Sequence, residues 1–151
     1  MLGIHHVSIS VPDLDAAVDW YGTILGFRLE ERFEITAIPA RGVFLRRDAL
    51  RIEIWEADGG ATVPALRREP NTDITEGGTK HVAFAVPDLQ RCLERLYNRG
   101  VDIASVQRDR CAPMACEADP RDATLGPAFA AFIRDPGGTL IELLDASRAG
   151  P

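Results

Sequence analysis

The chain has 151 residues, of which 46% are hydrophobic and 26% are charged, and its formal net charge is −6. This composition suits a globular protein that buries a core, and the length allows one domain or two small halves that share a core. The acidic balance, with both signs interspersed, argues against nucleic acid and anionic lipid as partners.

Membrane and disulfide classes are excluded by simple counts. No apolar run approaches the ~20 residues that span a bilayer, and the N-terminus lacks the pattern of a signal peptide. Three cysteines, an odd number, do not form a disulfide framework, and we expect Cys111 and Cys116 to be free thiols. We therefore predict a cytoplasmic protein with no membrane partner.

A β-prone stretch over residues 4–11 opens the chain, and its residues alternate with period two. Val7, Ile9 and Val11 share an apolar face, whereas His6 shares the opposite face with serine hydroxyls. The alternation predicts a strand that packs on one side and lines a polar cavity on the other.

A helix is predicted over residues 14–25, where apolar residues recur at helical spacing. Asp13 is a plausible N-cap, and Gly26 is a plausible C-terminal stop. Three strands should follow, over residues 27–33, 42–46 and 50–56. The last alternates cleanly, and its polar face carries Arg51, Glu53 and Trp55.

Residues 58–78, rich in Gly, Pro, Thr and charge, are predicted to link two halves. The second half then repeats the first: His81 opens a strand, Asp88 caps a helix, and Gly100 closes it. Further strands are expected over residues 101–106, 128–134 and 139–144, with a long loop over 107–127. The sequence thus predicts an α+β fold of two βαβββ modules, spanning about residues 1–57 and 79–146 of one domain.

Four residues fall at matched places on the polar faces of the two halves. A buried carboxylate without a partner is costly, so each glutamate needs a cation or a proton nearby. Two imidazoles and two carboxylates that converge would form a divalent metal site, and such mixed ligands do not separate Zn, Mn, Fe, Co and Ni. The predicted ligands are His6, Glu53, His81 and Glu142.

Three residues lie close to the predicted ligands in the sequence, and we expect one of them not to bind metal and leave two roles open for the others. Alternation sends His5 to the face opposite His6, so we expect it not to be a ligand. Arg51 and Trp55 could bind an anionic group and a planar part of a substrate. Equally, Arg51 could pair with a neighbouring carboxylate and Trp55 could fill core.

Over about residues 3–146 the sequence resembles the vicinal oxygen chelate superfamily, which includes glyoxalase I, methylmalonyl-CoA epimerase, extradiol dioxygenases and fosfomycin-resistance proteins. The resemblance implies paired βαβββ modules that form a cup-shaped, barrel-like mixed sheet around a metal, with helices outside. His6, Glu53, His81 and Glu142 fall where glyoxalase I carries His, Glu, His and Glu. The motifs that carry the resemblance are Ile4-His5-His6-Val7, Val11-Pro12-Asp13-Leu14, Tyr21 with Leu25-Gly26-Phe27, Lys80-His81-Val82, and Phe132 to Glu142.

The resemblance implies a metal-dependent isomerase, epimerase or lyase that acts beside a carbonyl on a small molecule with vicinal oxygens. The metal would stabilise an enediolate or enolate, and Glu142 or Glu53 would move the proton. Superfamily members are commonly dimers, and exposed sheet edges invite pairing, so we expect a homodimer. The alternatives are an Fe- or Mn-dependent extradiol-type dioxygenase and a metal-free binding or resistance protein.

Overall fold

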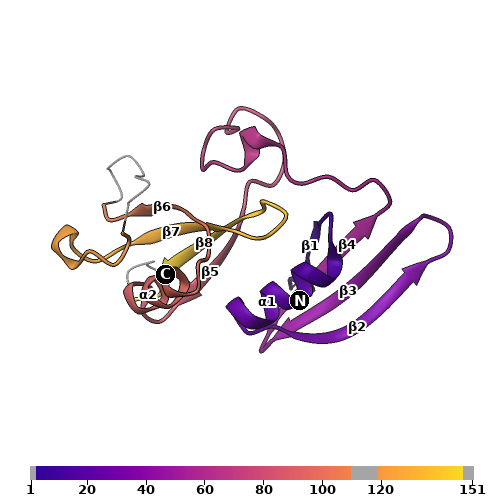
Figure 1. The fold of residues 1–151 in the computed structure, drawn as a ribbon, viewed down its shortest axis with the longest axis horizontal. Coiled ribbons are helices and arrows are strands. Elements are labelled where there is room, and N and C mark those ends of the chain that lie inside the picture. Colours follow the sequence, from indigo (N-terminus) through magenta and orange to yellow (C-terminus); the bar gives the residue numbers. More distant parts are fainter. Residues whose placement is uncertain (1–2, 110–118, 148–151) are drawn as a thin grey trace. The chain divides into compact units, whose positions relative to one another are not determined.

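The structure is a computed structural model, which describes residues 3–109 and 119–147. The chain divides into two compact units, residues 1–64 with 135–139 and residues 65–134 with 140–151. In the first module β1 (Val7–Ser10), α1 (Leu14–Leu25), β2 (Arg28–Ile35), β3 (Ala40–Arg47) and β4 (Leu50–Ala57) follow one another. The second module repeats this order with β5 (Val82–Val86), α2 (Leu89–Asn98), β6 (Ile103–Gln107), β7 (Ala130–Arg134) and β8 (Leu140–Asp145). The predicted α+β fold of two βαβββ modules is confirmed (Figure 1).

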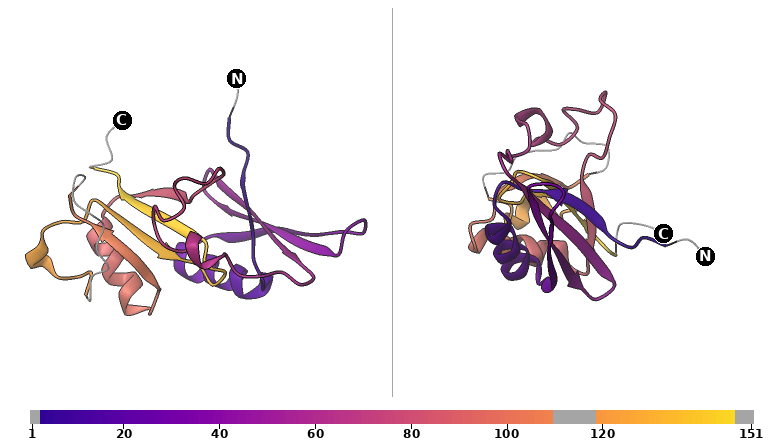
Figure 2. Two further views of the ribbon diagram at one scale, coloured as in Figure 1. Left: turned by 90° about the horizontal axis from the view of Figure 1, so that it is seen from above. Right: turned by 90° about the vertical axis from the view of Figure 1, so that its right-hand side faces the viewer.

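Both helices begin and end as their sequences predict. The side chain of Asp13 accepts a hydrogen bond from the Ala16 N–H, and Gly26 ends α1 in the left-handed conformation, with φ 74°. Asp88 caps α2 in the same way, and Gly100 follows with φ 68°. Each helix lies against one face of the sheet of its own module (Figures 1 and 2). The opposite face of each sheet is therefore left to carry the polar residues.

The two sheets have the same strand order, β1-β4-β3-β2 and β5-β8-β7-β6. In each, the first strand pairs in parallel with the last, and the other pairs are antiparallel. A register irregularity recurs at the same place, between Leu29 and Glu31 in β2 and between Ile103 and Ser105 in β6. The repeat therefore extends to single residues, including the extra residue of each β-bulge.

Each module buries its own apolar set. In the first module this core joins α1 to the inward residues of β3 and β4, and it comprises Leu14, Tyr21, Val43, Leu45, Ile52 and Ile54. In the second it joins α2 to β6, β7 and β8, and it comprises Leu89, Leu93, Leu96, Val106, Ile133, Ile141 and Leu143. The apolar faces predicted from alternation are those that pack.

The predicted linker over residues 58–78 is divided between the two units after residue 64. Its second part contains a short 3-10 turn, Ala65–Arg67, and the buried Asp73. The Asp73 carboxylate accepts hydrogen bonds from Arg67 and Lys80, both at 3.2 Å. Residues 65–78 are thus tied to the second unit by ion pairs rather than hanging free.

The turn at residues 135–139 is counted with the first unit. There the buried Tyr21 hydroxyl donates a hydrogen bond to Asp135 Oδ2 at 3.2 Å, and the Val63 N–H donates to the Gly137 carbonyl at 2.8 Å. The turn closes on itself through the Thr139 N–H, which donates to Asp135 Oδ1 at 2.8 Å. A turn between strands of the second module therefore completes the packing of the first unit.

Part of the predicted 107–127 loop, with Cys111 and Cys116, lies outside the described residues. Its described part includes another 3-10 turn, Ala123–Leu125. Within residues 3–109 and 119–147, no helix has the length and apolarity needed to cross a membrane.

Candidate metal centre

His6 and Glu53 meet on the polar face of the first sheet. His6 stands just before β1, and Glu53 lies on β4, which pairs in parallel with β1 so that Ser8 is opposite Glu53. The histidine Nε2 lies 3.5 Å from Glu53 Oε2, with side-chain exposures of 32% and 14%. Strand pairing thus holds an imidazole and a carboxylate together at a partly solvated surface.

His81 and Glu142 form the equivalent pair in the second module. Ala83, two residues after His81, is opposite Glu142 in the parallel pairing of β5 with β8. The histidine Nε2 lies 3.1 Å from Glu142 Oε2, with exposures of 33% and 18%. The predicted residues therefore come together as two pairs, one in each module.

Each histidine packs edge-on against a phenylalanine that was not among the predicted site residues. The ring centroids of His6 and Phe44 are 5.5 Å apart, and those of His81 and Phe132 are 5.2 Å apart. Phe44 is opposite Glu53, and Phe132 is opposite Glu142. The signal was present in the repeat, because each phenylalanine is followed by an aliphatic residue and an arginine.

The separation of the donor atoms in each pair fits a shared metal ion. Two donors that each lie ~2.1 Å from one ion, at roughly 90–109° to each other, are about 3.0–3.4 Å apart. The observed distances of 3.5 and 3.1 Å are close to this range without any rearrangement. Among the described residues, no three His, Cys, Asp or Glu side chains gather in a group that could hold a metal ion. Each pair by itself offers two ligands.

Glu53 has two polar neighbours that its counterpart Glu142 lacks. The polar side chains of Trp55 and Ser8 lie beside it and lower the pKa of its carboxyl group. Burial raises the pKa of Glu53, but the polar side chains of Trp55 and Ser8 and the basic groups nearby outweigh burial, so the pKa lies below its ordinary value. The equivalent positions around Glu142 are Ala83 and Leu144, whose side chains cannot donate hydrogen bonds.

The prediction that His5 points away from His6 is wrong. Nδ1 of His5 lies 2.7 Å from Nδ1 of His6, and Nε2 of His5 lies 3.0 Å from Nη1 of Arg51. The error arose because β1 begins only at Val7, so the alternation of the strand does not extend back to His5. His5 therefore lies beside the candidate ligand rather than behind it.

Arg51 is held by three neighbours of the same module. Its Nε donates to Glu30 Oε2 at 2.5 Å, its Nη1 contacts His5, and its guanidinium lies 3.8 Å from the centroid of the Phe44 ring. Glu30 also accepts from Arg46 at 2.8 Å, and hydrogen bonds from Arg51 and Arg46 lower the pKa of Glu30. Of the two interpretations of Arg51, pairing with a carboxylate is the one that the structure contains.

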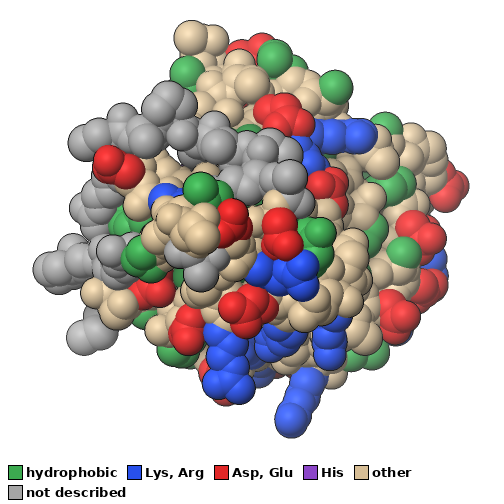
Figure 3. All heavy atoms as spheres, turned by 60° about the vertical axis from the view of Figure 1, so that its left-hand side comes forward, with side chains coloured by type: hydrophobic (Ala, Val, Ile, Leu, Met, Phe, Trp, Pro, Cys, Tyr) green, Lys and Arg blue, Asp and Glu red, His purple; other side chains and the backbone are tan. Residues whose placement is uncertain are grey.

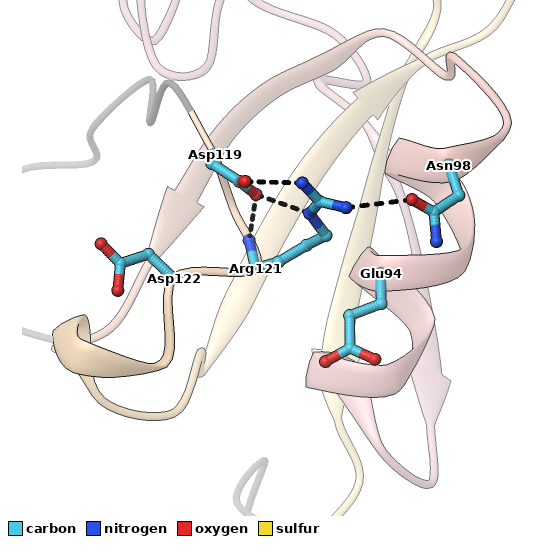
Figure 4. A pocket seen from close by; sticks show the side chains of 5 residues that line it. All are labelled: Glu94, Asn98, Asp119, Arg121 and Asp122. Carbon is cyan, nitrogen blue, oxygen red and sulfur yellow. Dashed lines mark hydrogen bonds and ion pairs between the residues drawn. The ribbon is translucent and has the colours of Figure 1, made fainter.

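The described surface also has a hollow of about 540 Å³ in the second unit (Figure 4), but it contains neither histidine pair. Arg121, at its centre, is bound by both oxygens of Asp119 and by Asn98, and it lies 4.3 Å from the ring centroid of Tyr97. Its charge is therefore already neutralised. Figure 3 shows acidic and basic side chains interspersed on one face, in keeping with the charge pattern of the sequence.

Comparisons with known proteins place the chain in a family. A family model described as the Glyoxalase/Bleomycin resistance protein/Dioxygenase superfamily matches residues 3–143. The chain is 25% identical over 163 residues to a 2-epi-5-epi-valiolone epimerase from an Actinomyces species, with 99% of this chain and 82% of the relative covered.

Solved structures show the same fold. A glyoxalase family protein from Enterococcus faecalis matches with a TM-score of 0.71 at 22% identity, over 95% of this chain and 97% of that chain. The trypanothione-dependent glyoxalase I of Leishmania major matches with a TM-score of 0.67 at 20% identity, over 97% of this chain and 88% of that chain. Together with its two repeated modules and the match over residues 3–143, this shows that the chain belongs to the glyoxalase, bleomycin resistance protein and dioxygenase superfamily.

Proposed function

We propose that the protein is a metal-dependent isomerase, epimerase or lyase that acts beside a carbonyl group of a small molecule with vicinal oxygens. The observation that carries the proposal is the exact repetition of one histidine–glutamate pair at equivalent register positions, with donor distances of 3.5 and 3.1 Å. Two ligands from each module would make a four-ligand site for one divalent ion, through His6, Glu53, His81 and Glu142.

A divalent ion bound to these residues would act as a Lewis acid towards two substrate oxygens, which makes the C–H beside the carbonyl more acidic. Two nitrogen and two oxygen ligands suit Zn, Ni, Co, Mn or Fe. With four protein ligands, an octahedral ion keeps two positions for substrate, which favours proton transfer over dioxygen chemistry.

Glu142 is the proposed general base, and Glu53 is the proposed permanent ligand. A general base must take up a proton, and the polar side chains of Ser8 and Trp55 lower the pKa of Glu53, which makes it the weaker base. Glu142 has Ala83 and Leu144 at those positions, so its carboxylate can turn towards a substrate carbon more easily. It would remove the proton and, in an isomerase, return it to the neighbouring carbon, whereas an epimerase needs a second acid that protonates the opposite face.

The name of the Actinomyces relative supports the epimerase branch of this proposal. We extend the proposal to a homodimer in a reducing compartment, which the odd number of cysteines suits. The small-molecule substrate is left at the level of its class, a carbonyl compound with a neighbouring oxygen.

Metal stoichiometry tests the proposal directly. The metal-free protein would be titrated with Zn²⁺, Ni²⁺ and Co²⁺ by calorimetry, and the washed complex would be analysed for bound metal. We expect one ion per chain, and we expect His6→Ala and His81→Ala each to abolish that single binding event. The matched control is Glu31→Gln, which removes an exposed carboxylate from the same face, opposite Phe44, and should leave binding unchanged.

Other outcomes would contradict the proposal in recognisable ways. If each pair bound its own ion, the parent would take up two ions per chain, and each histidine variant would lose only one. A parent that binds none of these metals would instead favour a binding or resistance protein. For a parent that binds one ion per chain, activity would be sought as exchange of the α-proton of cyclic hydroxyketones for deuterium, followed by NMR.

A further inference from the structure

Three aromatic side chains of the first module lie beside Glu53 on the same face of the sheet. The ring centroids of Phe33 and Trp55 are 4.9 Å apart, and those of Phe33 and Phe44 are 5.2 Å apart. All three side chains are half-buried, and Phe44 also contacts His6. We call Phe33, Phe44 and Trp55 the aromatic plate.

Gly42 makes this arrangement possible. In the sheet, Gly42 lies between Phe33 on β2 and Trp55 on β4, and the Phe33 ring crosses it. A Cβ at residue 42 would lie 2.5 Å from Cζ and 2.7 Å from Cε2 of Phe33. Glycine inside a strand often marks such a close approach, and any larger residue would push the ring away.

The second module shows that the plate is not needed to hold a histidine–glutamate pair. The pairing register places Gln107, Ala130 and Leu144 at the positions equivalent to Phe33, Gly42 and Trp55. His81 and Glu142 nevertheless meet as closely as His6 and Glu53 do. The repeat has therefore kept the candidate ligands and one phenylalanine, whereas the other two rings occur in the first module alone.

A second difference concerns charge. Glu30, Phe44 and Arg51 of the first module correspond to Ala104, Phe132 and Leu140, which form a buried apolar cluster in the second. Arg51 lies over the Phe44 ring, but its charge is already paired with Glu30 at 2.5 Å. Next to the plate, this ion pair offers a neutral surface rather than a free cation for an anionic tail.

We propose that the aromatic plate binds the ring of an uncharged cyclic substrate, and that Gly42 is a specificity-determining residue because it sets the position of Phe33. The proposal rests on the proposed function, since the vicinal oxygens of that substrate would lie at the Glu53 end of the plate. A ring stacked on an aromatic face is bound about 5- to 150-fold more tightly in other systems, so the aromatic plate should favour a ligand with a ring by about fivefold or more.

Two small chelators test this preference. Benzohydroxamate and acetohydroxamate present the same pair of vicinal oxygens, but only the first carries a ring. On the metal-loaded parent, we expect calorimetry to give a preference for benzohydroxamate over acetohydroxamate that is about fivefold or more larger than in Phe33→Gln or Gly42→Ala. These substitutions install the residues of the second module, and the control Gln107→Ala in that module should keep the parental preference.

Further measurements keep the result interpretable. Metal affinity should be the same in the parent and in Phe33→Gln, because neither Phe33 nor Gly42 is a ligand. If Gly42→Ala fails to fold, the hydroxamate preference of Phe33→Gln alone tests the role of the plate. The double variant Phe33→Gln with Gly42→Ala should fold, because it lacks the ring that a Cβ at residue 42 would meet. In a Trp20→Phe background, Trp55 is the one tryptophan left of two, and benzohydroxamate should quench its emission.

The outcomes separate the two proposals. Metal binding with equal hydroxamate preferences in parent and Phe33→Gln would overturn the role of the plate and leave the proposed function intact. Loss of the preference in Gln107→Ala would also overturn it. A parent that binds no metal would refute the proposed function, and the ring preference would fall with it.

Discussion

Nδ1 of His5 lies 2.7 Å from Nδ1 of His6, so only one proton can occupy the space between the two rings. Arg51 has only donors, and it faces Nε2 of His5 at 3.0 Å. A neutral His5 must therefore accept from Arg51 at Nε2 and donate from Nδ1 to His6. The N–H of a neutral His6 is then on Nε2, which faces Glu53.

This proton arrangement competes with a metal ion for His6. A metal needs the lone pair of Nε2, so the proton must move to Nδ1 and the contact between His5 and Arg51 must break. We predict that Arg51→Leu raises metal affinity by about three- to tenfold, because it removes both that contact and a nearby positive charge. Calorimetry would measure the affinity, and ¹⁵N NMR of the imidazoles should show the Nε2–H form of His6 in the metal-free parent.

The matched control is Arg46→Leu. Arg46 also pairs with Glu30, at 2.8 Å, but no contact with His5 is recorded for it among the described residues. If both variants raise affinity equally, the effect belongs to Glu30 or to general charge and not to the histidine pair.

The two glutamates should respond differently to the same substitution. Glutamine can coordinate through its oxygen but is a negligible base, so Glu142→Gln should keep much of the metal and lose about 10²- to 10⁴-fold in proton exchange. Glu53→Gln should keep a larger share of the exchange rate, because the lowered pKa of Glu53 makes it the weaker base. Deuterium exchange at matched metal occupancy would measure both. Equal rates for Glu142→Gln and the parent would remove Glu142 as the base.

Asp135 should make folding stability depend on pH in the direction opposite to most carboxylates. Burial raises the pKa of Asp135, although hydrogen bonds from Thr139 and Tyr21 partly oppose it. The folded chain thus holds this proton more tightly than the unfolded chain. The stability contributed by Asp135 is present below the ordinary carboxyl pKa and is lost as pH rises through the raised value.

Denaturant titrations at several pH values would check this. The difference in unfolding free energy between parent and Asp135→Asn should decrease from acidic to neutral pH. Asp119→Asn should show the opposite trend, since hydrogen bonds from Arg121 lower the pKa of Asp119 to about 2, and its contribution is lost as pH falls towards that value. If the stability differences of both variants changed with pH in the same direction, the opposite pKa shifts of Asp135 and Asp119 would be contradicted.

The edge strand β2 is where we expect a second copy to pair. It ends the sheet order of the first module, and all its residues except Phe33 are exposed, whereas the equivalent strand β6 is largely buried. Light scattering should give about twice the 16.5 kDa of the chain. Ile35→Lys should shift the mass towards the monomer, and Ile74→Lys, on an exposed loop, should not. A monomeric parent would refute the dimer.

The sequence predicted helix α1 to the residue, because Asp13 and Gly26 each carry their own local signal. It also predicted which faces of β1 and β4 pack, since alternation continues through those strands. The bulge at Glu30 has no comparable signal, and it is the bulge that brings this carboxylate to Arg51 and Arg46. The prediction for His5 failed for the same reason, because the position of its side chain depends on backbone that lies outside the regular strand.

Two repeated modules suggest a chain that can be divided at the segment between them. The turn at residues 135–139 removes that option, because it supplies the acceptor for the buried Tyr21 hydroxyl. A chain opened between residues 64 and 65 would leave an N-terminal fragment with an unsatisfied phenol in its core and a C-terminal fragment with a bare turn. The copies have become mutually dependent, so a change in one half can be compensated only within the intact polypeptide.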